Sequence, residues 1–165
     1  MRAMIKTLTG AALAAATAMS IVSPAFGADG LRILMQDNDT AVAPLQWTEP
    51  KAIPAGTRMI MVYGNPSEAG PYIFRVRFPA GYRLPPHRHT DQRQVTVLEG
   101  YYWSAAGETF DESRLKRFGP RDHYITEGNV PHFAWAETEV LIQEAGIGPI
   151  SNPIQYVRPE DDPRR

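Results

Sequence analysis

The stretch that decides the fold runs from Gly81 to Gly100 and reads GYRLPPHRHTDQRQVTVLEG. It places His87 and His89 one residue apart, directly after two prolines that stiffen the chain. In an extended segment, residues i and i+2 project to the same face, so both imidazoles can reach one ion. Neutral imidazole is a common ligand for divalent iron, manganese, zinc, nickel and copper. The spacing therefore predicts half of a metal site, with a pair of solvated loop histidines as the alternative.

A third histidine follows later in the chain, in a similar local setting. His132 comes directly after Gly128-Asn129-Val130-Pro131 and begins a segment with strand character. It is the natural third ligand for a site built around His87 and His89. His123 also precedes a strand-like segment, but we expect it at the surface or at a strand end.

Short extended segments separated by turn signals account for most of the remaining chain. In residues 72–78 the apolar side chains at 72, 74, 76 and 78 share one face, whereas Arg75 and Arg77 share the other. We expect the two arginines on an outer sheet face, with the lining of an anion-binding cavity as the alternative. The polar stretch 107–119 reads as a loop with one helical turn near 111–117. The predicted strands are 58–63, 72–78, 94–98, 101–103, 123–126, 132–136, 139–144 and 156–157.

Composition supports an all-β fold and excludes several classes of protein. The 165 residues include 15 prolines and 13 glycines, which favour short strands joined by turns. There is no cysteine, so disulfides, thiolate nucleophiles and cysteine-ligated zinc are excluded. The formal net charge of -1 lacks the basic excess of a nucleic-acid-binding protein, so we expect no nucleic-acid partner.

The first 27 residues have the layout of a secretory signal peptide. Arg2 and Lys6 precede an apolar run of small residues, and Ala25 and Gly27 flank a cleavage site after Gly27. The alternative is a helix that packs on the domain or anchors it. Cleavage would leave residues 28–165 as a single domain that is periplasmic or secreted, without a membrane anchor.

Residues 81–100 resemble the first sequence motif of the cupin superfamily. Gly81, His87, His89 and Gly100 all fall at motif positions. The second cupin motif is similar to residues 119–132 only loosely, since Thr126-Glu127-Gly128 replaces its Pro-x-Gly and one extra residue precedes His132. The resemblance covers about residues 45–163.

The resemblance implies a double-stranded β-helix, or jelly roll, with a core at about residues 45–150. It also implies a mononuclear metal site inside the barrel, with His87, His89 and His132 as ligands. The metal would be a divalent transition ion: iron, manganese, zinc, nickel or copper. Cupins often pair through sheet edges or faces, so the resemblance implies a homodimer.

The fourth ligand of the family, a glutamate, is absent. Counting back from Gly100 places Arg93 at its position, and counting forward from His89 places Gln94 there. A guanidinium cannot ligate a metal, whereas the amide oxygen of Gln94 can do so weakly. Three neutral ligands and a cation at Arg93 should strengthen the binding of an anion and weaken retention of the metal.

Two functions remain open at this level, because a fold does not fix a function. One is a metal-dependent enzyme, of dioxygenase or isomerase type, acting on a small anionic organic substrate. The other is a non-catalytic, small-molecule-binding or metal-free cupin. Three further groups have weaker claims to a role. The glutamates 99, 127 and 144 are candidate acid/base groups, and the basic residues 114, 116, 117 and 121 are expected in a solvated loop. The aromatic residues 101, 102, 103, 133 and 135 are expected in the core, with an aromatic pocket as the alternative.

Overall fold

The computed structural model describes residues 46–150 and 154–165, and the signal-peptide prediction lies outside these residues. The described part contains ten strands and two 3-10 helices. They are β1 (Arg58–Tyr63), β2 (Gly70–Phe78), β3 (Arg83–Arg88), β4 (Arg93–Glu99), β5 (Tyr102–Ala106), η1 (Glu112–Arg114), β6 (Lys116–Phe118), β7 (His123–Thr126), β8 (His132–Ala136), β9 (Val140–Gly148), β10 (Gln155–Tyr156) and η2 (Pro159–Asp161). Neither helical turn of the described part is long enough to cross a bilayer.

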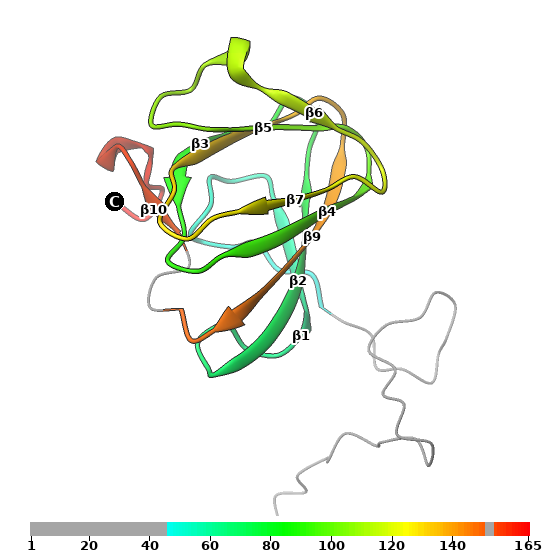
Figure 1. Cartoon of the computed structure of the whole chain (residues 1–165), viewed down its shortest axis with the longest axis vertical. Coiled ribbons are helices and arrows are strands. Elements are labelled where there is room, and N and C mark those ends of the chain that lie inside the picture. Colours follow the sequence, from blue (N-terminus) through cyan, green and yellow to red (C-terminus); the bar gives the residue numbers. More distant parts are fainter. Residues whose placement is uncertain (1–45, 151–153) are drawn as a thin grey trace, which may run out of the picture. The chain divides into compact units, whose positions relative to one another are not determined.

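The strands form two five-stranded antiparallel sheets (Figure 1). One sheet has the order β1-β2-β9-β4-β7 and the other the order β10-β3-β8-β5-β6. From β2 to β5 and from β6 to β10, strands that follow one another in the chain belong to different sheets, whereas β1 and β2, like β5 and β6, pair within one sheet. This alternation between two sheets is the jelly-roll arrangement, and it confirms the predicted all-β class.

The core lies between the two sheets and follows from the period-two pattern of the strands. On β2, Tyr72, Phe74, Val76 and Phe78 are all buried, and they meet apolar side chains of the facing sheet such as Leu84. Burial of each such side chain contributes roughly 1.5–3 kcal/mol. The arginines between them on β2 are on the outside of the sheet.

All eight predicted strands are present, with small shifts at their ends, and two observed strands, β3 and β6, are not predicted. Pro85 and Pro86 lack N–H groups, so the sequence does not predict β3 as a paired strand. The structure accommodates them through a register shift between Leu84 and His87 in the pairing with β8. The helical turn near 111–117 is present as η1, but the rest of that loop contains β6, which pairs only with β5 at the edge of its sheet.

The core extends past the predicted boundary at residue 150. Ile154 is buried at 4 % exposure and belongs to the main hydrophobic cluster. In β10, Tyr156 pairs with His87 across the sheet, and its hydroxyl donates a hydrogen bond to the carbonyl oxygen of Ala52 at 3.0 Å. The C-terminal segment therefore supports the strand that carries the first histidine.

Candidate metal centre

The structure brings His87, His89 and His132 together at the junction of β3 and β8. His87 and His132 face each other directly in the register of these strands, and His89 comes one residue after the end of β3. One ring nitrogen from each histidine lies within 4.8 Å of the corresponding nitrogens of the other two. The side chains are 2 %, 5 % and 8 % exposed. The group can hold a metal ion, since its three nitrogens are close enough to share one.

Backbone hydrogen bonds leave a free lone pair on two of the rings. Nδ1 of His87 donates to the carbonyl oxygen of Pro85 at 2.8 Å, and Nδ1 of His132 donates to that of Val130 at 3.0 Å. A carbonyl oxygen only accepts, so Nδ1 carries the proton in both rings and Nε2 carries the lone pair. Burial lowers the pKa of both imidazoles, so both are neutral near pH 7. Neutral rings of this tautomer are suited to bind a divalent metal.

The turn before β8 fixes the position of His89. The backbone N–H of Asn129 donates to the carbonyl oxygen of His89 at 2.6 Å. Asn129 has a φ of 62°, a conformation that asparagine tolerates better than most residues. A Cβ at Gly128 would lie 2.9 Å from the carbonyl oxygen of Thr90, so only glycine allows the turn to come this close. The segment that loosely matches the second cupin motif thus packs against the segment of the first motif.

The prediction that Gln94 is a ligand is wrong. On β4 the side chains of Arg93, Val95 and Val97 point inward, whereas Gln94 is exposed on the opposite face. Successive residues of a strand project to opposite faces, so the Gln94 amide cannot reach the histidines. Arg93 is therefore the residue that occupies the inward position in the register of the missing carboxylate.

Arg93 is held by two largely buried carboxylates, those of Asp91 and Glu144. Its side chain is 5 % exposed, with Nη1 3.1 Å from Oε2 of Glu144 and Nε 3.2 Å from Oδ2 of Asp91. The hydroxyl of Tyr72 donates to Asp91, and the guanidinium lies over the ring of Phe74. Burial lowers the pKa of Arg93, but the two carboxylates and Tyr72 outweigh it and hold the pKa above its ordinary value. Two carboxylates offset the charge of Arg93. Arg93 should therefore strengthen anion binding and weaken metal retention less than an unpaired cation would.

Two pockets meet the histidine cluster from different sides. The first has a volume of about 530 Å³, lies between β5, β6, β7 and β8, and includes His132 in its lining. The second has a volume of about 130 Å³ and includes His87, His89, Arg93 and Glu144. The remainder of this second lining is almost wholly apolar. A metal held by the three imidazoles would therefore lie between a larger pocket of mixed lining, on the side of His132, and a smaller apolar pocket, on the side of His87 and His89.

The three candidate glutamates have different environments. Glu99 is exposed and pairs with Arg77, and Glu127 accepts a hydrogen bond from Gln92 at 2.9 Å. Glu144 is partly buried beside Arg93. Burial raises the pKa of Glu144, and the guanidinium opposes this shift. Glu144 lines the second pocket with His87 and His89, and Glu127 lines the first pocket with His132.

The remaining polar candidates divide between the outer surface and the first pocket. Arg75 donates to Gln143 at 3.1 Å on the outer face of the β1-β2-β9-β4-β7 sheet, which confirms the outer-face prediction. His123 is exposed at the start of β7, as expected. The basic residues of the 107–119 segment have different surroundings. Arg117 pairs with Glu137 on the surface, whereas Arg114 and Lys116 line the first pocket.

The aromatic residues do not form one pocket. Tyr102 and Phe133 are core residues at 3 % and 0 % exposure. Tyr101 is 38 % exposed and lies under the guanidinium of Arg117. Trp103 and Trp135 pack against each other at 5.9 Å between ring centroids.

The sequence does not predict the partners of Arg93. No pattern in it points to Asp91 or Tyr72 as part of the site, and Glu144 is only one of three candidate glutamates. The usable signal is the alternation along β4, because Val95 and Val97 on the inward face place Arg93 there too. A buried arginine requires buried acceptors, so inward-facing carboxylates on neighbouring strands were to be expected.

Comparison with solved structures places this architecture among known folds. The chain is similar to the DMSP lyase DddQ from Ruegeria pomeroyi DSS-3, with a TM-score of 0.57 and 18% identity over 70% of this chain and 62% of that one. It is similar to the polyketide cyclase RemF from Streptomyces resistomycificus, with a TM-score of 0.57 and 18% identity over 72% of this chain and 84% of that one. The chain has the cupin fold.

The cupin likeness extends to a variant of salicylate 1,2-dioxygenase from Pseudoaminobacter salicylatoxidans, with a TM-score of 0.50 and 16% identity. The match covers 61% of this chain and 28% of that one. At these identities the likeness concerns the fold alone. No model of a protein family matches the sequence, and no curated protein is significantly similar to it. A lyase, a cyclase and a dioxygenase share this fold, so the reaction has to be argued from the site.

Proposed function

We propose that this cupin is a metal-binding protein in which His87, His89 and His132 hold one divalent transition metal. It would act on a small anionic organic substrate, by dioxygenase-type or isomerase-type chemistry. The observation that carries the proposal is the convergence of three buried imidazoles within 4.8 Å. The hydrogen bonds of two of them to backbone carbonyls add support, because they direct Nε2 to the ligand role.

The donor set favours an anionic substrate. Three imidazoles are neutral, so a bound divalent metal would keep its full double charge and act as a Lewis acid toward a substrate oxygen. Arg93 stands where the family has a glutamate ligand, so no carboxylate from this position reduces the charge of the metal. Arg93 itself is paired with Asp91 and Glu144. The larger pocket gives the substrate space beside His132, and its volume of about 530 Å³ is typical of small-molecule sites.

Metal analysis of the untagged protein tests the proposal. We expect about one metal per chain after loading with iron, manganese, zinc, nickel or copper, and loss of most of it in the His89→Ala variant. The His123→Ala variant is the matched control, since His123 is exposed and lies outside the cluster. Less than about 0.1 metal per chain under every loading condition would reject the proposal.

The second candidate function is a metal-free cupin that binds a small molecule without catalysis. The observation that favours it is the buried Arg93 in the register of the family carboxylate. The same metal analysis separates the two functions. If metal is bound, screening the loaded protein against small carboxylates, diketones and phenols tests for turnover.

We also propose export and homodimer formation, both of which rest on the sequence. Expression of the full chain in a bacterial host should give a periplasmic or secreted product that begins at Ala28. Detection of intact Met1 on protein inside the cell would contradict export. Light scattering of the purified protein should give twice the mass of one chain, and a single-chain mass would contradict the dimer.

A further inference from the structure

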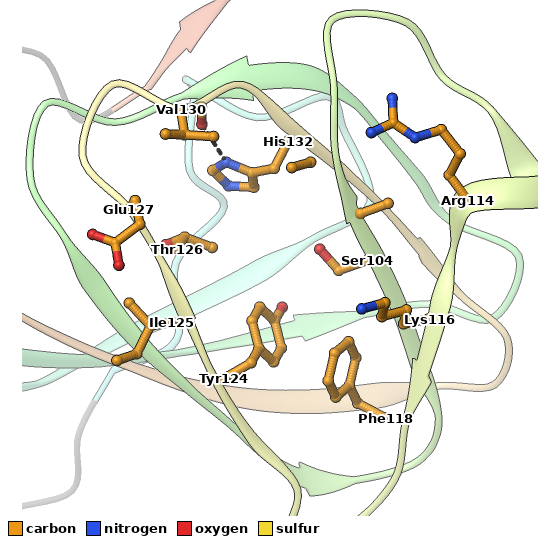
Figure 2. A pocket seen from close by; sticks show the side chains of 12 residues that line it. Ser104, Arg114, Lys116, Phe118, Tyr124, Ile125, Thr126, Glu127, Val130 and His132 are labelled. Carbon is orange, nitrogen blue, oxygen red and sulfur yellow. Dashed lines mark hydrogen bonds between the residues drawn. The ribbon is translucent and has the colours of Figure 1, made fainter.

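The outer face of the β1-β2-β9-β4-β7 sheet carries the two most exposed large apolar side chains of the described residues. Ile147 on β9 is 65 % exposed, and Ile125 on β7 is 50 % exposed. Figure 2 shows the position of Ile125: Tyr124 points into the first pocket, whereas Ile125, which borders that pocket, lies on the other side of the strand. Both isoleucines therefore face away from the core of the barrel.

The register of the strands places the two isoleucines in one patch. One row across four neighbouring strands contains Ile125, Gln94, Ala145 and Ile73. The next row along β9 contains Ile147 and its partner Pro71 on β2. We call these six residues the uncharged patch, since none of them carries a charge. Single exposed apolar residues are ordinary on a protein surface, but neighbouring ones on a sheet face mark an interaction site.

Charged side chains border the uncharged patch without entering it. Glu127 on one side and Arg75 on the other are each bonded to a neighbouring glutamine, at 2.9 Å and 3.1 Å. Further along the same face, Arg77 pairs with Glu99 and Glu139. An apolar centre with a polar rim is the usual composition of a protein–protein interface. Because these rim charges have partners within the chain, covering the patch leaves none of them unpaired.

The size of the face suits a second copy of the chain. Strands about 4.8 Å apart that rise about 3.4 Å per residue provide about 16 Å² of sheet per residue. The strands of this sheet thus provide roughly 600 Å² of flat surface. A stable interface of standard size covers about 800 Å² on each partner, and the turns at the sheet ends can supply the remainder.

The outer face of the other sheet is less suited to a symmetric contact. Its central row contains Arg83, Trp135, Trp103 and Arg117. The two indoles pack on each other at 5.9 Å between ring centroids and are only partly exposed. The arginines at both ends of this row make it a charged face.

We infer that two copies of the chain meet through the outer face of the β1-β2-β9-β4-β7 sheet, with the uncharged patch of each copy at the centre. The inference rests on the homodimer proposed above and adds the face and the residues. In a symmetric dimer both copies use the same patch, so the patch has to be complementary to itself. An uncharged patch meets this condition, because two identical copies bring no like charges together at the centre.

Opposite charges placed in the patch test the inference. The variants are Ile125→Lys/Ile147→Lys and Ile125→Glu/Ile147→Glu of the full chain, measured by sedimentation velocity. Each variant should dimerise at least about a hundredfold more weakly than the wild type, because like charges meet across the symmetry axis. An equal mixture of the two variants should form dimers again, because opposite charges then meet.

Tyr101→Ser is the matched control, since Tyr101 is 38 % exposed and lies outside the patch. This variant should keep the wild-type mass. Both patch positions are exposed, so we expect the charged variants to fold, with unchanged circular dichroism and unchanged urea midpoints.

The outcomes distinguish this inference from the proposed function. A wild-type dimer that persists in both charged variants would overturn the inference and leave the homodimer in place. Monomeric variants whose mixture stays monomeric would also overturn it, because the patch then does not contact itself. A wild-type protein that is monomeric at every concentration would reject both the inference and the homodimer. The metal function is decided separately by metal content, because the three histidines are buried inside the barrel.

Discussion

Nη1 of Arg93 lies 3.1 Å from Oε2 of Glu144, and this ion pair joins adjacent strands β4 and β9 in the interior, beside the histidine cluster. Asp91 completes the arrangement from the other side of the guanidinium. The position where the resemblance expects a metal-ligating carboxylate thus carries a cation, and its charge is met by carboxylates from elsewhere in the chain. Two predictions concern this pair directly.

Replacing Arg93 by glutamine should destabilise the metal-free protein by about 3 kcal/mol. The change leaves Asp91 and Glu144 buried without their cation, and unpaired buried charges are costly. Urea denaturation of the metal-free protein measures the effect. The control is Arg117→Gln, whose pair with Glu137 is on the surface and should matter little. Similar unfolding midpoints for the two variants would contradict a structural role for the buried pair.

The same Arg93→Gln variant should bind Zn²⁺ more tightly, by about tenfold, even though it is less stable. Arg93 lies close enough to disfavour positive charge on His87 and His132, and its removal leaves two carboxylates nearby. Competition with a chromophoric chelator measures the affinity. Unchanged or weaker zinc binding by the folded variant would show that Arg93 does not oppose the metal.

Replacing Gln94 by alanine should leave the metal content unchanged. Gln94 is exposed on the face of β4 that points away from the histidines. Elemental analysis of Gln94→Ala beside His89→Ala makes the comparison. A fall in metal content in both variants would restore Gln94 as a ligand.

The two glycines that bound the first motif should differ sharply in their tolerance of alanine. Gly81 and Gly100 have φ values of 79° and 74°, so alanine is strained by about 1–2 kcal/mol at either position. A Cβ at Gly81 would meet nothing within 4 Å, whereas a Cβ at Gly100 would overlap the carbonyl oxygen of Glu139. We expect Gly100→Ala to lose at least about 2 kcal/mol more stability than Gly81→Ala, as measured by urea denaturation. Equal losses would mean that the backbone at Glu139 moves aside.

The sequence by itself determined the class of fold and the three histidines. The alternation on β2 and the spacing of His87 and His89 are local properties, because a strand projects its side chains with a period of two. His132 could be added because a similar turn precedes it. The same local rule, applied to Val95 and Val97, would also have placed Arg93 inside and Gln94 outside.

The tertiary structure alone decided which distant residues meet. The pairing of His87 with His132 and the ion pair of Arg93 with Glu144 depend on contacts between strands far apart in the chain. The sequence predicts that a buried arginine needs acceptors, but sheet order and register determine which acceptors reach it.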